Sequence, residues 1–157
     1  MKKIAIITLI LGMIASGACW WKFHHASNPP RANVAEFESD MTEGLLRGIF
    51  QELDAGNPAV YFVAFGEART EPSPAFIARF ADHVPPVRIF TSSVLTPNGL
   101  ILETSTGRAG VIIQIISFKE YIPGTFDVLV ALSNNNRFVY RVSNTTDAWK
   151  IKSRKAE

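Results

Sequence analysis

The sequence predicts an α+β fold in which a long N-terminal helix and a short second helix pack on a curved antiparallel β-sheet. Three observations predict it. Apolar residues recur at helical spacing over residues 33–55, and a continuous apolar run of β-forming residues follows at 59–65. From residue 87 onward, short stretches that alternate apolar and polar residues are separated by turn residues. Helices that cover one apolar face of an antiparallel sheet give this two-layer fold class.

The first helix is expected over residues 33–55 because its apolar residues form one broad stripe. The stripe consists of Val34, Phe37, Met41, Leu45, Leu46, Ile49, Phe50 and Leu53. Asn33 and Glu36 have the spacing of a capping box, and Gly56 stands where a left-handed residue commonly ends a helix. Pro58 prevents continuation. The stripe is broad and aromatic, so we expect this helix to cover a sheet.

The run at 59–65 is too apolar for an exposed edge and predicts a buried strand. A second helix is expected to begin with Ser73 as its N-cap and Pro74 at its first position. It runs to about His83, where the prolines at 85 and 86 stop it. The sequence thus predicts one strand between two helices.

The rest of the chain is expected to form strands joined by short turns. Strands are predicted at 87–91, 100–105, 109–118, 126–132, 137–142 and around Trp149 and Ile151. Turns are predicted at 97–99, 106–107, 122–124 and 134–136. Successive strands connected in this way predict an antiparallel meander.

Residues 1–21 are predicted to be a signal peptide or an N-terminal membrane anchor. Lys2 and Lys3 precede a stretch without any charged residue at 4–21, which is the pattern of a secretory signal. This interpretation divides the remainder into a linker at 22–32, a single α+β domain at 33–153 and a tail at 154–157.

Three fates of the N-terminal segment are open. The segment could be cleaved after Ala18, lipidated at Cys19 or retained as a membrane anchor. Retention is consistent with the length of the segment, because an uncharged helix over 4–21 spans roughly 27 Å of a hydrocarbon core about 30 Å thick. The domain is then periplasmic, associated with the inner or outer membrane if anchored or lipidated, and otherwise secreted.

Charge and cysteine usage exclude some classes of function. The formal net charge of +2 comes from Lys2 and Lys3, and the remaining acidic and basic side chains balance. A neutral domain argues against nucleic acid as a partner. Cys19 is the single cysteine, so no internal disulfide forms. Acidic residues concentrate in the first helix and basic residues near the C-terminus. Either the two regions are solvated or lie near each other in the fold, or they form a docking surface with an electrostatic bias.

Few motifs point to catalysis. The sequence has no Gly-x-Ser-x-Gly elbow, phosphate loop or dinucleotide fingerprint. The adjacent His24 and His25 in the linker do not predict a metal site, and we expect no cofactor. A hydrolase would have to combine His83 with Ser92 or Ser93. Glu103 and Asp127 lie in predicted strands, and a solvated face is their simplest location.

A ligand pocket between helix and sheet is the other candidate site. The positions that would line it are Tyr61, Arg79, His83, Arg88 and Arg108. An apolar cavity with a few convergent polar groups would favour a small ligand. A filled interior with an exposed apolar patch would favour a protein partner.

The region from about 58 to 152 resembles a family of small exported bacterial proteins without an assigned activity. The matching residues are Tyr61, Phe62, Pro72, Ser73, Phe76, Arg79, Phe80, His83, Pro85, Pro86, Val87, Ser92, Thr106, Gly107, Gly110, Tyr140, Val142 and Trp149. Glu71 stands where the family usually has Asp, and residues 133–136 replace a glycine-rich turn. At the level of the fold, the order of elements is similar to the nuclear-transport-factor-2-like (NTF2-like) or cystatin-like architecture. The resemblance implies export and this fold, and it implies no chemistry.

The sequence therefore favours a non-enzymatic cell-envelope protein that binds a protein partner or a small ligand and contacts the membrane through its N-terminal segment. The alternative is a periplasmic hydrolase that uses His83 with Ser92 or Ser93. The sequence does not specify the oligomeric state.

Overall fold

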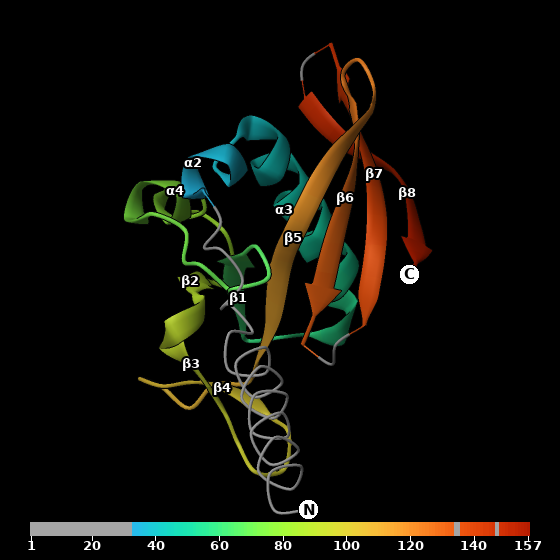
Figure 1. Ribbon diagram of the computed structural model, residues 1–157. Helices are drawn as coiled ribbons and strands as arrows, with labels where there is room; N and C mark the ends of the chain where they lie inside the picture. The colour runs from blue at the N-terminus through green and yellow to red at the C-terminus, as the bar shows by residue number, and fades with distance from the viewer. Residues whose placement is uncertain (1–32, 134–135, 147) are drawn as a thin grey trace, which may run out of the picture. The chain divides into compact units, whose positions relative to one another are not determined.

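Helix α3 (Asp40–Leu53) lies along one face of a six-stranded sheet, and these two elements form the layers of the fold (Figure 1). The computed structural model describes residues 33–133, 136–146 and 148–157. The predicted leader at 1–21, the linker at 22–32, Cys19 and part of the turn at 134–136 lie outside the described residues. In the described part, no helix is long and apolar enough to cross a membrane.

The sheet has the strand order β2-β1-β5-β6-β7-β8. Its strands are β1 (Val60–Phe65), β2 (Val87–Ile89), β5 (Gly110–Ile122), β6 (Thr125–Leu132), β7 (Arg137–Thr145) and β8 (Ala148–Ala156). Strands β5 to β8 form the predicted antiparallel meander, and the α+β class is confirmed. β8 continues to Ala156, beyond the domain boundary expected at 153. Register shifts in β5 and β8 bend the meander (Figure 1).

The expectation of a wholly antiparallel sheet is wrong at one edge, where β1 runs parallel to both β2 and β5. All six residues of β1 are buried, as is typical of a strand in parallel pairing that is covered on both faces. On its second face, Val60 and Phe62 pack against Ile101 of a separate hairpin made of β3 (Ser93–Leu95) and β4 (Ile101–Glu103). This hairpin and the short helix between β1 and β2 supply the connections that parallel neighbours need.

The first predicted helix is interrupted, so that α2 (Val34–Phe37) precedes α3. Ser39 caps α3, since its Oγ accepts a hydrogen bond from Thr42 N at 3.3 Å. Glu38 leaves the helical path and its carboxylate accepts hydrogen bonds from the backbone N and the Oγ of Ser73. The apolar periodicity did not reveal this break because it depends on a contact with a distant residue.

The predicted caps of the first helix differ from the observed ones. The Asn33 side chain donates to Glu36 Oε1 at 3.0 Å but accepts no backbone N–H, so the capping box does not form. After α3, a 3₁₀ turn η1 (Asp54–Gly56) follows, and Asn57 rather than Gly56 takes the left-handed conformation, with φ of 50°. Asparagine tolerates this conformation better than most residues.

Helix α4 (Pro74–Ala78) begins as predicted and ends early. Ser73 Oγ accepts a hydrogen bond from Phe76 N at 3.1 Å, and proline stands in the first turn. Beyond Ala78 the chain continues in turns to His83 rather than as helix. The predicted strand at 87–91 is likewise shortened, because a 3₁₀ turn η2 (Phe90–Ser92) follows β2.

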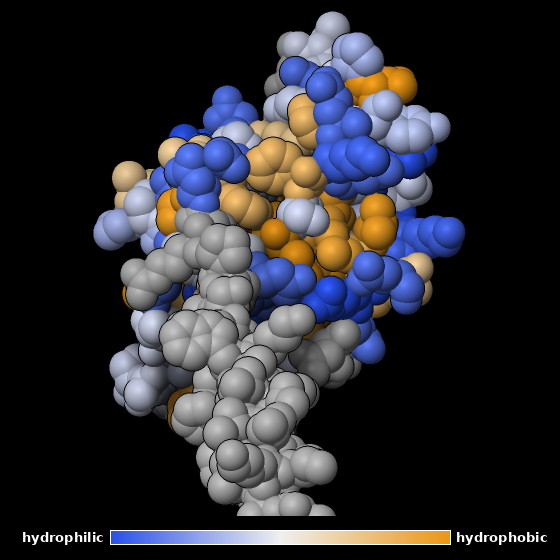
Figure 2. All heavy atoms as spheres, in the orientation of Figure 1, coloured by the Kyte–Doolittle hydropathy of each residue, from blue (hydrophilic) through white to orange (hydrophobic). Residues whose placement is uncertain are grey.

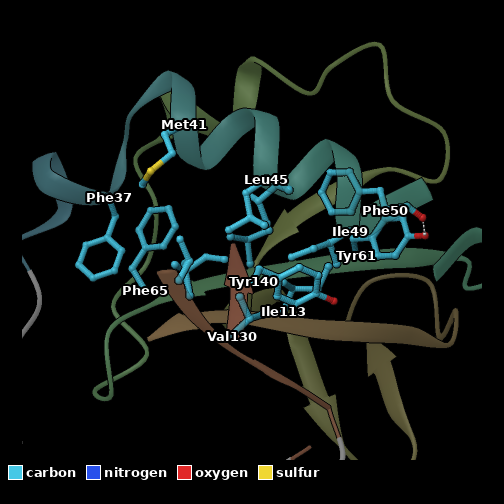
Figure 3. Close-up of a cluster of buried hydrophobic side chains, with 14 of the residues drawn as sticks. Phe37, Met41, Leu45, Ile49, Phe50, Tyr61, Phe65, Ile113, Val130 and Tyr140 are labelled. Carbon is cyan, nitrogen blue, oxygen red and sulfur yellow. Dashed lines mark hydrogen bonds between the residues drawn. The ribbon is translucent and has the colours of Figure 1, made fainter. Parts of the chain in front are cut away.

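The interior between α3 and the sheet is filled by side chains from both layers (Figure 3). Phe50 stacks on Tyr61 with ring centroids 4.5 Å apart, and Phe37 stacks on Phe65 at 5.2 Å. On the face away from α3, Figure 2 shows apolar side chains gathered over β5 and β6 within a hydrophilic border. Leu129 and Val139, which are cross-strand neighbours, are half-buried on that face.

Two glycines let α3 approach the edge strand β8 closely. A Cβ on Gly44 would lie 2.8 Å from Trp149 Cβ and 3.0 Å from Trp149 O, and a Cβ on Gly48 would lie 2.7 Å from Ile151 Cδ1. The two glycines are one helical turn apart and so share a face of α3. Their lack of side chains sets the distance between helix and strand.

We expect Gly44→Ala to lower the free energy of unfolding by about 1–3 kcal/mol, because the new methyl group would lie only 2.8 Å from Trp149 Cβ and 3.0 Å from Trp149 O. The loss occurs even though alanine in a helix normally gains about 1 kcal/mol over glycine. Urea unfolding followed by circular dichroism measures it. Gly56→Ala is the control, since no atom lies within 4 Å of its Cβ, and should change stability by under about 1 kcal/mol. Equal stability of Gly44→Ala and wild type would contradict the close approach.

Candidate functional site

Tyr61 is a core residue. Its side chain is fully buried, and its one hydroxyl proton is shared between Asp54 Oδ1 at 2.7 Å and Phe50 O at 3.2 Å. Burial, followed by the hydrogen bond to Asp54 and the charge of that carboxylate, raises the pKa of Tyr61 well above its ordinary value. A neutral, fully hydrogen-bonded phenol of this kind joins helix to sheet.

His83 lies at the border of the same core. Its ring is 4.6 Å from the ring of Phe50, and its Nδ1 lies 2.8 Å from Pro85 O. A carbonyl oxygen only accepts, so this nitrogen carries the proton. Ser93 Oγ donates to Phe90 O at 2.6 Å. Among the described residues no hydrogen bond joins His83 to Ser92 or Ser93, which follow β2 while His83 precedes it.

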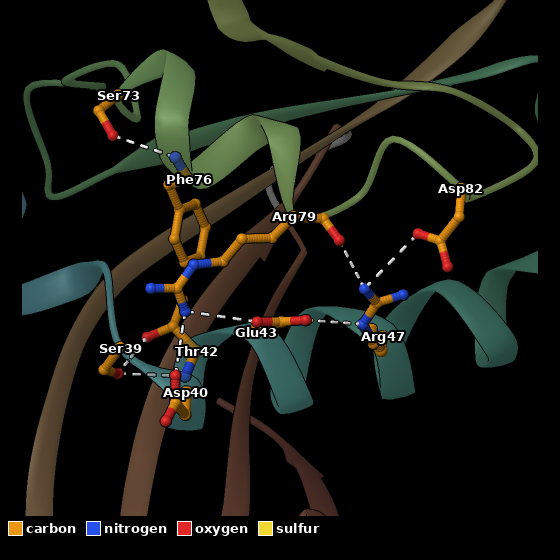
Figure 4. Close-up of polar contacts among 9 residues, drawn as sticks. All are labelled: Ser39, Asp40, Thr42, Glu43, Arg47, Ser73, Phe76, Arg79 and Asp82. Carbon is orange, nitrogen blue, oxygen red and sulfur yellow. Dashed lines mark hydrogen bonds and ion pairs between the residues drawn. The ribbon is translucent and has the colours of Figure 1, made fainter.

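Arg79 lies at the end of α4 and forms ion pairs with α3 (Figure 4). Its Nη1 is 3.0 Å from Asp40 Oδ1 and 3.4 Å from Glu43 Oε2, and its guanidinium lies over the ring of Phe76. Glu43 also pairs with Arg47 at 3.0 Å, and Arg47 Nη2 donates to the backbone oxygen of Arg79 at 2.6 Å. These contacts attach the α4 segment to the solvent-facing side of α3.

Arg88 and Arg108 belong to a different cluster, around Glu103. Arg88 is paired with Phe62 in register, so it lies on the sheet face away from Tyr61. Glu103 is 5% exposed and accepts hydrogen bonds from Thr106 Oγ1 and from Arg88 Nε at 3.3 Å. The Thr106 hydrogen bond and then the charges of Arg88 and Arg108 lower the pKa of Glu103. The solvated location expected for Glu103 is therefore wrong.

The five predicted pocket positions thus do not converge. Tyr61 and His83 meet at Phe50, while Arg79 lies on the outside of α3 and Arg88 and Arg108 flank Glu103. Asp127, which was also singled out, binds Arg141 through both carboxylate oxygens at 2.7 and 2.8 Å. Within the described residues, no group of three or more His, Cys, Asp and Glu side chains has the arrangement of a metal site.

A groove of about 1070 Å³ lies between α3 and β8. Gly44, Gly48, Trp149 and Ile151 contribute the apolar part of its lining, and charged residues of both elements border it. These bordering residues are Asp40, Glu43, Arg47, Glu52 and Lys150. Arg79 adjoins this groove through its ion pairs with Asp40 and Glu43.

Among the described residues, one wall of the groove is an edge of the sheet with no further strand beside it. β8 is nine residues long and ends the strand order, so every second residue directs its backbone N–H and C=O away from β7. The strand is strongly basic, with Lys150, Lys152, Arg154 and Lys155, of which Arg154 pairs with Glu52 at 2.9 Å. The C-terminal positive charge is visible in the sequence, whereas the groove was not predicted from it. The signal for the groove is the pair of glycines one turn apart on the first helix, which leaves that helix face without side chains.

No family model matches the chain, and neither the curated proteins nor the solved structures contain a match to it. The resemblance to small exported bacterial proteins therefore stays a prediction.

Glu103 provides a test of pH-dependent stability. Because its pKa is lowered in the folded state, ionised Glu103 stabilises the fold above its ordinary pKa of 4.5, and this contribution is lost as the pH falls through the lowered pKa. Glu103→Gln should lower the free energy of unfolding at pH 7 by about 1.5–3 kcal/mol, and the difference from wild type should shrink below pH 4.5. Urea unfolding at a series of pH values measures it. The exposed Glu120→Gln is the control and should leave the curve unchanged. A difference that stays constant down to strongly acidic pH would contradict the role of the charge.

Proposed function

We propose that this protein is a non-enzymatic binding module of the cell envelope, and that its groove between α3 and β8 receives an extended segment of a protein partner. The segment would add to β8 as a further strand and take up hydrogen bonds that the edge leaves open. The observation that carries the proposal is the coincidence of a nine-residue free edge with a groove of about 1070 Å³ beside it.

A protein partner fits this geometry better than a small ligand. The space between helix and sheet, where a small ligand was expected, is filled by buried side chains such as Phe50, Tyr61 and Ile113 (Figure 3). The groove instead lies on the outside and follows the strand from Ala148 to Ile151. An extended polypeptide matches a site of this shape because it offers backbone groups to the edge and side chains to the groove.

The side chains of β8 indicate which residues a bound segment should carry on each of its two faces. Trp149 and Ile151 face α3, and Lys150 and Lys155 lie on the other face of the strand. A segment with apolar side chains toward α3 and acidic side chains toward the lysines would match both faces. Pairing with β8 of a second copy would bring like charges together, which disfavours self-association through this edge.

We further propose that the chain is exported, with an N-terminal segment that targets it to the envelope or holds it at the membrane. Lys2, Lys3 and the uncharged stretch at 4–21 support this. A long helix across a bent, largely antiparallel sheet also supports an NTF2-like or cystatin-like architecture, from which the parallel pairs of β1 depart. The hydrolase alternative finds no support in the contacts of His83 and Ser93, each of which bonds to a backbone carbonyl.

We expect a peptide of alternating valine and glutamate residues to bind the protein and to shift the backbone amide resonances of β8 and of the α3 residues beside it. A peptide of alternating valine and lysine should bind weakly or not at all. Lys150→Glu should weaken binding of the acidic peptide by about tenfold, a loss of about 1.4 kcal/mol. Nuclear magnetic resonance titration and calorimetry measure these effects.

Lys119→Glu is the matched control, since Lys119 is also an exposed lysine and lies on β5, away from the edge. It makes the same charge change and should leave the affinity within about twofold of wild type. Equal binding of acidic and basic peptides, or shifts confined to residues other than β8 and α3, would argue against the proposal.

A further inference from the structure

The hairpin β3–β4 exposes large apolar side chains at its tip. Val94, Leu95 and Leu100 are 47%, 69% and 52% exposed. The base of the hairpin is rooted in the fold, because Ile101 is 7% exposed and packs against Val60 and Phe62 of β1. A fixed base with an apolar tip distinguishes this hairpin from an ordinary polar connection.

The hairpin and its flanks carry no charge over residues 89–102, in a chain in which 19% of residues are charged. Most surface connections contain Lys, Glu or Asp, which would oppose entry into an apolar phase. The polar residues of the tip are instead Thr96 and Asn98. A segment without charged side chains can move from water into an apolar environment at a lower free-energy cost.

Hydrogen bonds within the tip pair several of its polar groups. Thr96 N donates to Leu100 O at 2.8 Å, Gly99 N to Thr96 O at 2.9 Å, and Leu100 N to Thr96 Oγ1 at 3.0 Å. Thr96 Oγ1 in turn lies within hydrogen-bond distance of Asn98 Oδ1. Backbone groups that are already paired reduce the cost of moving a segment from water to a lipid interface.

Positive charge lies at the base of the same hairpin. Arg88 has 48% of its side chain exposed and Arg108 is exposed, while Glu103 neutralises one of the two charges. Glu71, which accepts hydrogen bonds from Thr91, and Arg69, which lies over the ring of Phe90, add one charge of each sign. The remaining charge is placed to attract anionic headgroups once the apolar tip has entered.

We propose that the β3–β4 hairpin is a lipid-contact element that inserts Val94, Leu95 and Leu100 into the interface of an anionic bilayer. Three apolar side chains are far fewer than the roughly 20–30 residues that each partner of a stable protein interface contributes, which argues against a second copy as the occupant. The predicted linker at 22–32 reaches at most about 40 Å when fully extended, so a leader retained in the membrane would keep the domain near the bilayer. The hairpin shares no residue with the α3–β8 groove, so the two proposals stand independently.

The test uses the full chain with Cys19→Ser and Leu95→Cys, which carries a nitroxide label at the tip. Electron paramagnetic resonance compares the exposure of the label to oxygen and to a water-soluble nickel complex, with vesicles of phosphatidylglycerol and phosphatidylcholine. When vesicles are added, we expect the accessibility of the label to oxygen to rise and its accessibility to the nickel complex to fall at least about fivefold. Oxygen partitions into the bilayer, whereas the nickel complex stays in water. The readout is specific to the labelled position, so binding of vesicles by the N-terminal segment does not imitate it.

Gln51→Cys in the same Cys19→Ser background is the control, because Gln51 is exposed on α3 beside the groove, and its label should stay in water. Adding Leu100→Asp to the Leu95 variant should return the tip label to water. A tip label that remains accessible to nickel with vesicles present would overturn the proposal. A label protected equally without vesicles would also overturn it, because the occupant would then be another protein surface.

Discussion

The contact between Phe50 of α3 and Tyr61 of β1 fixes the position of the helix on the sheet, and most other features depend on it. The two rings stack at 4.5 Å, and the Tyr61 hydroxyl reaches the backbone of the same helix and Asp54 just beyond its end. His83 then closes over Phe50 from the segment that leads to β2. One aromatic cluster thereby joins helix α3, strand β1 and the turn that precedes β2. With the helix held at this point, its other end meets β8 at the distance that Gly44 and Gly48 allow.

Much of this fold could be predicted from local patterns. The stripe from Met41 to Leu53 predicted the helix and its buried face, and the run at 59–65 predicted a fully buried strand. Ser73 and Pro74 predicted the start of α4. The parallel pairing of β1 and the break at Glu38 were not predicted, because both depend on partners far away in the sequence. An apolar run indicates burial on two faces without indicating the direction of its neighbours.

The candidate site was harder to predict than the fold. The sequence predicts a pocket lined by Arg79, Arg88 and His83, yet in the structure these residues are engaged in contacts that hold elements together. The groove instead forms where Gly44 and Gly48 of α3 have no side chains and where β8 is the edge strand of the described sheet. Neither feature involves a reactive side chain. A search for chemistry in the sequence therefore overlooks it, whereas the basic C-terminal strand was visible as an uneven distribution of charge.

The contact between Glu38 and Ser73 has a mechanical consequence. Helix α4 has five residues, too few to persist by itself, and the carboxylate that holds its cap comes from a residue 35 positions earlier. Glu38 lies close to the point where the chain enters the domain, so tension on the preceding segment would act on the contacts of the Phe37 ring with Phe65 and Phe118 and then on this contact. Its release would loosen the cap of α4 and then the connection between β1 and β2, while the meander from β5 to β8 remained paired. Tension applied from the N-terminal side would thus disturb the parallel pair β1–β2 before it disturbed β8, which borders the groove.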